Sequence, residues 1–286
     1  MTAATMPGAG PAAGPDAADL YALGSNLEET ARLRRQSDEL RPESAELLGR
    51  IGLEPGQSAI DLGCGPSGIL DQLSAAVSPD GRVVGLDSDP AHAAQAGQYA
   101  IAAGLANVEV ITADARRTGL PSGSFDLVHA RTLLVNIPDP AEVVAEMVRL
   151  ARPGGWVACL EPDAEYALCH PPLPAWDRLR EIFVLSHDQL GADLLIGRRL
   201  AELFRQAGLE DIDVMSYAPI YPTGHSRRTL LPDLVRSMRP RILELGLADE
   251  GELAELDRTV REHFADPRTL IMSHLIFVVR GRKPRA

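Results

Sequence analysis

The chain has 286 residues, 45% of them hydrophobic and 24% charged, which is enough for one large domain or one domain with an insertion. The 28 basic and 40 acidic residues give a formal net charge of −12, which argues against nucleic-acid or membrane partners. The three cysteines lack metal-ligand spacing, so we expect no metal site. Without a signal-peptide pattern or a long apolar run, we expect a cytoplasmic protein.

The N-terminal part divides into two predicted segments. Residues 1–18 are rich in Ala, Gly and Pro, and we expect them to form a disordered tail. Residues 19–42 are expected to form a helical segment or lid, with a helix from Leu27 to Leu40. Because this helix carries few large apolar residues, it either lies on the surface or covers a polar pocket.

From residue 43 onward, helical and strand patterns alternate. A helix is predicted at 43–51, and further helices at about 69–77, 90–103 and 140–151 separate strands at 58–62, 82–87, 108–112, 125–129 and 156–160. Strands that alternate with helices predict right-handed β-α-β units and a parallel sheet.

After the fifth strand the alternation is interrupted by longer helical stretches. Helices are predicted at 176–190 and 197–207, and strands at 212–217 and about 270–280. Residues 43–286 are therefore expected to form one α/β domain with a doubly wound, mostly parallel, seven-stranded Rossmann-like sheet. Segments of about 171–196 and 218–268 would form a helical cap over its pocket.

A glycine-rich turn follows the first strand. Asp61 ends that strand, and Gly63, Gly65 and Gly68 follow it. Such turns bind dinucleotides or S-adenosylmethionine (SAM), and some bind no ligand. Pro66 lacks the N–H group that would help hold a pyrophosphate, and Asp61 would repel one but could bind a methionyl ammonium group. These two residues favour SAM.

Acidic residues also follow the next two strands. Asp87 ends the second strand about twenty residues past the glycine turn, where a carboxylate can accept both ribose hydroxyls. Asp114 follows the third strand and could accept a hydrogen bond from the adenine amine, while the N–H of Ala115 meets a ring nitrogen. Either acid alone could be a helix cap, but their joint spacing favours a nucleoside site.

The segments AIDLGCGPSG, VVGLDSD, ITADA, SFDLVHAR and LARPGGW resemble, in this order, class I SAM-dependent methyltransferases. The resemblance covers about residues 43–163 and is strongest to the small-molecule branch with ubiquinone/menaquinone-type and actinobacterial natural-product enzymes. It implies SAM as cofactor, S-adenosylhomocysteine (SAH) as product, and a cofactor site formed by Asp61, Gly63, Gly65, Asp87, Ser88, Asp114, Ala115 and Arg131. One departure is Asn136, where related enzymes often have a histidine.

The resemblance implies in-line methyl transfer to an O, N or C atom of a small organic molecule, of the kind found in natural product biosynthesis. Candidate catalytic bases are Glu161 and His187, and Tyr21 could close over the methionine end of SAM. Arg198-Arg199 and Arg227-Arg228 are either solvated or bind an anionic substrate. Alternatives are a cyclase that uses SAM without methyl transfer, a nonenzymatic SAM-binding protein and a nicotinamide dehydrogenase. A homo-oligomer is possible.

Overall fold

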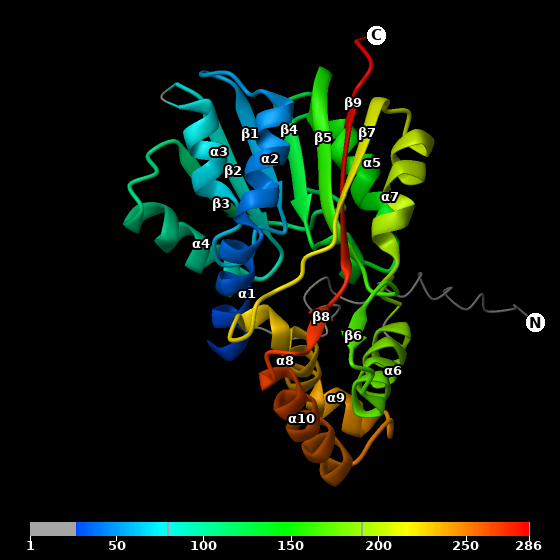
Figure 1. The fold of residues 1–286 in the computed structure, drawn as a ribbon. Coiled ribbons are helices and arrows are strands. Elements are labelled where there is room, and N and C mark those ends of the chain that lie inside the picture. The colour runs from blue at the N-terminus through cyan, green and yellow to red at the C-terminus, as the bar shows by residue number, and fades with distance from the viewer. Residues whose placement is uncertain (1–26, 79, 190, 286) are drawn as a thin grey trace, which may run out of the picture.

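A seven-stranded sheet forms the centre of the molecule (Figure 1). The computed structural model describes residues 27–78, 80–189 and 191–285, so the predicted tail 1–18 and Tyr21 lie outside the described residues. The strands lie in the order β3-β2-β1-β4-β5-β9-β7, with β9 antiparallel to both of its neighbours and the pairs from β3 to β5 parallel. Their bounds are β1 Ser58–Leu62, β2 Arg82–Asp87, β3 Val108–Thr112, β4 Phe125–Arg131, β5 Ala151–Asp163, β7 Glu210–Tyr217 and β9 Leu275–Arg282. The predicted doubly wound, mostly parallel sheet is confirmed.

Helices cover both faces of this sheet, because side chains along each strand alternate between the two faces. On β1, Ala59 packs into the cluster that includes α2 (Arg41–Ile51) and α3 (Leu70–Val77), with α4 (Pro90–Ala102) beside them. Ile60 packs on the opposite face, into the cluster formed with α5 (Pro140–Leu150) and α7 (Ile196–Gln206). The interiors of β1 and β2 are therefore apolar up to Asp61 and Asp87 near their carboxyl ends.

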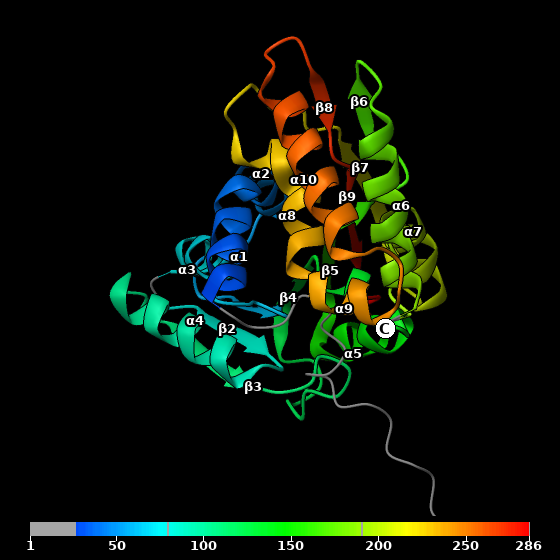
Figure 2. The same ribbon diagram turned by 90° about the horizontal axis from the view of Figure 1, so that it is seen from below.

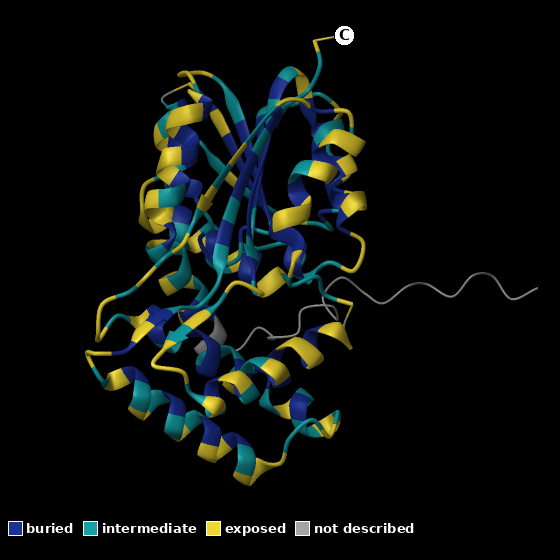
Figure 3. Cartoon of the chain, turned by 45° about the vertical axis from the view of Figure 1, so that its right-hand side comes forward, coloured by how far each residue is buried: buried dark blue, intermediate teal, exposed yellow. Residues whose placement is uncertain are grey.

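The cap lies beyond the carboxyl ends of the parallel strands and has a hydrophobic core of its own (Figures 1 and 2). Its helices are α6 Pro174–Asp188, α8 Leu230–Ser237, α9 Arg239–Glu244 and α10 Glu250–Ala265. Trp176, Phe183 and Phe264 are among its buried residues. The outward faces of these helices are exposed, as Figure 3 shows. The cap is thus built from two insertions, one between β5 and α7 and one between β7 and β9.

The last predicted strand is wrong in one respect. Instead of one strand over 270–280, the chain forms β8 (Leu270–Met272) and then β9, with Ser273 and His274 between them. β8 pairs with β6 (Leu168–His170) in a two-stranded antiparallel ribbon that joins the cap. The polar pair interrupts the apolar run at the point where the chain passes from the cap into the central sheet.

Helix α1 (Leu27–Glu39) lies between the sheet and the cap. Its residue Ser37 donates a hydrogen bond of 2.5 Å to the carbonyl of Gly68, in the turn after β1. Towards the cap, Glu39 of α1 pairs with Arg227 at 3.1 Å. Arg227 belongs to the short helix η3 (Ser226–Thr229), which precedes α8. The helix therefore bridges the two parts of the molecule.

Candidate functional site

The turn after β1 presents bare backbone to a pocket. Gly63, Gly65 and Gly68 have φ values of 67°, 56° and 53°, a region that favours glycine. A Cβ on Gly65 would meet no heavy atom within 4 Å, whereas one on Gly68 would lie 2.2 Å from Asp61 Oδ2. The turn therefore leaves open space on its outer side for a ligand and is tightly packed on its inner side.

Asp61 supports this turn from beneath. Its Oδ1 lies 2.7 Å from His129 Nδ1 on the neighbouring strand, and its Oδ2 accepts a 3.1 Å hydrogen bond from the N–H of Ile69. The carboxylate is buried but still lines the pocket. Both oxygens thus fix the turn, and the predicted contact with a methionyl ammonium group stays a prediction.

Asp87 holds the other end of the turn. Its Oδ2 accepts a 2.7 Å hydrogen bond from the N–H of Gly65, and its Oδ1 accepts one of 2.9 Å from the N–H of Asp89. Burial raises the pKa of this carboxyl, and the two N–H groups act in the opposite direction. Each carboxylate oxygen keeps a second lone pair, so Asp87 fits a role in accepting ribose hydroxyls. Ser88, next to it, is half-buried.

Asp114 is engaged differently from what we expected. Arg116 donates to both of its oxygens, through Nε at 3.1 and 3.0 Å and through Nη2 at 2.7 Å, and its backbone N–H donates at 2.8 Å. The hydrogen bonds from the Arg116 side chain are the main reason that the pKa of Asp114 lies below its usual value. A hydrogen bond to adenine would require Arg116 to move. The predicted roles of Asp114 and of the buried Ala115 remain predictions.

Arg131 lies where β4 ends and reaches the same turn. It donates to Ser44 Oγ at 3.1 Å, to Ser37 Oγ at 2.8 Å and to the carbonyl of Gly68 at 3.4 Å. Burial lowers the pKa of this guanidinium to about 10, with Asp61 acting in the opposite direction. No ion pair within the described part of the chain includes Arg131. A ligand carboxylate at this position would supply the missing negative charge.

These groups fit SAM. Arg131 contacts Gly68 at one end of the turn, and Asp87 contacts Gly65 at the other. A cation that suits the amino-acid carboxylate and an anion that suits the ribose diol therefore flank a stretch of open backbone.

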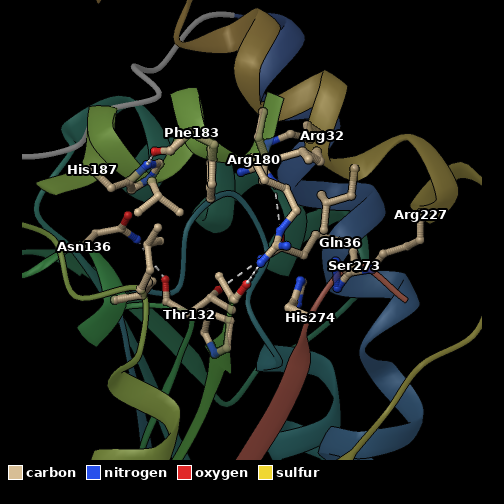
Figure 4. A pocket seen from close by; sticks show the side chains of 18 of the residues that line it. Arg32, Gln36, Thr132, Asn136, Arg180, Phe183, His187, Arg227, Ser273 and His274 are labelled. Carbon is tan, nitrogen blue, oxygen red and sulfur yellow. Dashed lines mark hydrogen bonds between the residues drawn. The ribbon is translucent and has the colours of Figure 1, made fainter. Parts of the chain in front are cut away.

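A second cavity lies between the sheet and the cap (Figure 4). Its empty volume is about 920 Å³, including the space at its opening to solvent. Leu33, Gln36 and Thr132 line both this cavity and the pocket at the glycine turn. The two spaces therefore meet at these three residues.

Hydrogen bonds cross this junction. Arg32 Nη1 donates to Gln36 Oε1 at 2.7 Å, and Gln36 Nε2 donates to Thr132 Oγ1 at 3.1 Å. Thr132 has a φ of 51°, an unfavourable conformation for a β-branched residue. The side-chain Nδ2 of Asn136 donates to the backbone carbonyl of Thr132 at 3.1 Å. The amide of Asn136 thus holds the strained residue at the junction.

The two predicted catalytic residues lie in different surroundings. Glu161 is buried, and its carboxylate accepts hydrogen bonds from the N–H groups of Leu133, Leu134 and Val135 at 2.9, 2.9 and 3.2 Å. Burial raises its pKa to about 7 against the effect of these three bonds. Glu161 thus positions the loop and the short helix η2 (Leu134–Asn136) after β4, and its predicted role as a base stays a prediction.

His187, by contrast, lines the cavity from α6. Its Nδ1 donates to the carbonyl of Phe183 at 2.9 Å, which leaves the lone pair of the neutral ring on Nε2. Burial lowers the pKa of His187. The imidazole is therefore neutral near pH 7, the state that a general base requires.

Three further cavity residues were missed in the sequence: Arg32, Arg180 and His274. Burial, together with the charge of Arg227, lowers the pKa of His274 to about 3. The polar pair Ser273-His274 inside an apolar run was the available signal for His274. The two arginines lie on helices with many charged residues, so their sequence gave no sign of a cavity.

Most of the arginines in the two predicted pairs are used in the fold. Arg198 pairs with Asp163 at 2.9 Å, and Arg199 pairs with Asp193. Arg228 donates to backbone carbonyls, among them that of Phe264 at 2.9 Å. Arg227 alone of the four lines the cavity.

Within residues 27–78, 80–189 and 191–285, no group of three or more His, Cys, Asp or Glu side chains is placed to hold a metal ion. No helix there has the length and apolar character that crossing a lipid bilayer requires.

Comparison with known proteins identifies the part of the chain that contains the glycine turn. Residues 60–159 match the family described as a methyltransferase domain. A demethylmenaquinone methyltransferase of Geobacillus kaustophilus is 33% identical over 184 residues, covering 60% of this chain and 79% of that protein. An uncharacterized 37.1 kDa protein in transposon Tn4556 of Streptomyces fradiae is 36% identical over 172 residues, and the match spans about half (49%) of its length.

Solved structures agree in fold. Haemonchus contortus phosphoethanolamine N-methyltransferase 2, in complex with phosphomonomethylethanolamine and SAH, superimposes with a TM-score of 0.56 and 21% identity. The match covers 85% of this chain and 52% of that one. The structural likeness shows the fold, and the sequence likeness to the demethylmenaquinone methyltransferase shows the family. This chain belongs to the class I SAM-dependent methyltransferases, and SAM is its cofactor.

Proposed function

We propose that this enzyme transfers the methyl group of SAM to an O, N or C atom of a small organic molecule bound under the cap. The observation that carries the proposal is the junction at Leu33, Gln36 and Thr132, where the pocket at the glycine turn meets the cavity. In this proposal, an acceptor in the cavity reaches the cofactor at this junction. Its reacting atom would lie beside Gln36 and Thr132.

In this proposal the cofactor is held at its amino-acid part and at its ribose. Arg131 binds the methionine carboxylate and Asp87 the ribose hydroxyls, while Gly63 and Gly65 allow close approach of the backbone. Asp61 orients the turn through Ile69 and lines the pocket, and we assign to it the hydrogen bond from the ammonium group. Ser88, Asp114 and Ala115 complete the nucleoside side.

SAM supplies a methyl group on a positively charged sulfur, which is already a strong electrophile. The protein therefore gains most by aligning the acceptor, since orientation can contribute roughly 7–11 kcal/mol. A general base adds about 10²–10⁴-fold. His187 is our candidate for that base, because its neutral Nε2 belongs to a residue that lines the cavity.

The finer proposal is a cytoplasmic enzyme of natural product biosynthesis. The apolar residues of the cavity suit an organic acceptor, and the free cysteines Cys64, Cys159 and Cys169 suit a reducing compartment. Cyclisation in the presence of bound SAM remains the second candidate function from the sequence. A product that lacks the added methyl group would indicate it.

The first test is calorimetric titration of the purified protein with SAH. Wild-type protein should bind in the micromolar range, and Asp87→Ala should bind roughly tenfold to a hundredfold more weakly, because hydrogen bonds to a charged group contribute about 1.5–3 kcal/mol. Asp80→Ala is the matched control, since Asp80 is exposed and precedes the opposite end of β2. A screen of acceptors with isotope-labelled SAM would then look for methylated products. Folded wild-type protein that binds no SAH would disprove the proposal.

A further inference from the structure

The cavity under the cap has an unusual charge. Arg32, Arg180 and Arg227 line it, while no Asp or Glu is among its described lining residues. The chain as a whole carries a net charge of −12. Because the chain as a whole is acidic, its composition alone would not predict a cavity that is lined by three arginines.

Two of these arginines have partners that tie α1 in place. Arg227 pairs with Glu39 at 3.1 Å, and Arg32 donates to Gln36 at 2.7 Å. The contact of Arg227 holds α1 against the cap, and the contact of Arg32 orients Gln36 at the junction.

Arg180 is held in another way. Its Nη2 donates to the backbone carbonyls of Ala164 and Glu165 at 3.3 and 3.1 Å. Its guanidinium carbon lies 5.0 Å from the centre of the Trp176 ring on the same helix. No ion pair among the described side chains includes it. The guanidinium is thus fixed in position on the cap side of the cavity without a carboxylate partner.

From this arrangement we infer that the acceptor carries a carboxylate, which Arg180 binds. The inference rests on the proposed function and adds the class of its substrate. A guanidinium binds carboxylates in a two-pronged geometry, and the partly desolvated charge strengthens the bond. Arg227 is already paired with Glu39, so the charge that Arg180 offers matches a singly charged carboxylate more closely than a doubly charged phosphate.

The remaining lining residues define the rest of the substrate. Phe183, Leu194, Leu231 and Leu234 are apolar and line the same cavity as Arg180. Arg180 belongs to the cap, while Gln36 and Thr132 lie at the junction on the sheet side. The substrate is therefore an amphipathic acid whose carboxylate faces the cap and whose reacting atom, on an apolar body, faces the cofactor.

Trp176 offers a direct readout, because it stacks with Arg180. The protein has two tryptophans, so Trp156→Phe leaves Trp176 as the sole tryptophan. In this background, loaded with SAH, benzoate, cinnamate and decanoate would each be titrated against its neutral primary amide. At least one acid should change Trp176 emission and bind about tenfold or more tightly than its amide. Arg180→Gln should remove this preference and leave amide binding unchanged, with binding followed by calorimetry.

Arg205→Gln is the control, because it removes the same charge from an exposed arginine on α7. It should keep the preference for the acid. The inference is overturned if no acid binds the SAH-loaded protein, if amides bind as tightly as acids, or if Arg180→Gln keeps the preference. Calorimetry with SAH alone separates this from failure of the proposed function: protein that does not bind SAH fails both, whereas protein that binds SAH without acid preference fails only the inference.

Discussion

Arg131 is the residue from which the clearest effect on cofactor binding is expected. Arg131→Gln removes a half-buried cation without an ion-pair partner among the described residues, so the affinity for SAH should fall by roughly tenfold to a hundredfold. 5′-Methylthioadenosine lacks the amino-acid part of SAH, and its affinity should not change. Calorimetry with both ligands measures the two effects. Equal losses for both would mean that Arg131 only maintains the shape of the pocket.

Glu161 should make stability depend on pH. Its pKa is raised by burial to about 7, so the folded state holds the proton more strongly than the unfolded chain does. The resulting stabilisation is present below the ordinary glutamate pKa and is lost as the pH rises through about 7, by at most about 1.4 kcal/mol per pH unit. The free energy of unfolding of wild-type protein relative to Glu161→Gln should therefore decrease from about pH 5 to about pH 8.

Denaturant titrations at a series of pH values would measure this difference. A difference that increases with pH would show the reverse: the three N–H groups of residues 133–135 would then outweigh burial, and the folded-state pKa would lie below its ordinary value.

At the scale of elements, α1 links the cofactor turn to the cap. Arg227 is only 3% exposed and pairs with Glu39 at 3.1 Å. Glu39→Gln would leave a buried charge without its partner, which should destabilise the protein by about 1–3 kcal/mol or more. Glu262→Gln, which weakens the exposed pair with Arg258 on α10, should cost less than about 1 kcal/mol. Denaturant unfolding compares the two, and equal effects would contradict a linking role for α1.

The elements also show how far sequence reasoning reaches. The strands up to β5 were predicted because buried strands form continuous apolar runs between turns, and Asp61 and Asp87 follow from where those strands end. The ribbon of β6 and β8 was not predicted, since three-residue strands carry no periodic pattern. Arg180 and Gln36 were missed for a related reason: contacts between segments far apart in the chain place them at the cavity.

At the scale of the whole molecule, the sheet and the cap each contain one tryptophan. Trp156 lies in β5 and Trp176 in the core of the cap. The two insertions that build the cap are separated in the chain by α7 and β7, so the ordered sheet is what brings them together. We therefore expect one cooperative unfolding transition for both parts.

Variants Trp156→Phe and Trp176→Phe, each with a single remaining tryptophan, would report on the cap and the sheet respectively. For each variant, unfolding in denaturant would be followed by tryptophan fluorescence and by circular dichroism. The fluorescence midpoint should agree with the circular-dichroism midpoint of the same variant. A cap signal lost well before the loss of helical signal would show that the cap unfolds separately.

The two insertions that form the cap both follow β5 in the chain. The family match ends at Cys159, before either insertion begins, and the residues that we assign to the cofactor all precede that point. If the acceptor binds under the cap as we propose, mutations in the cap would change which molecule is accepted and leave the residues assigned to the methyl donor unchanged. A graft of another relative's two insertions onto this sheet would be a direct way to exchange one acceptor for another.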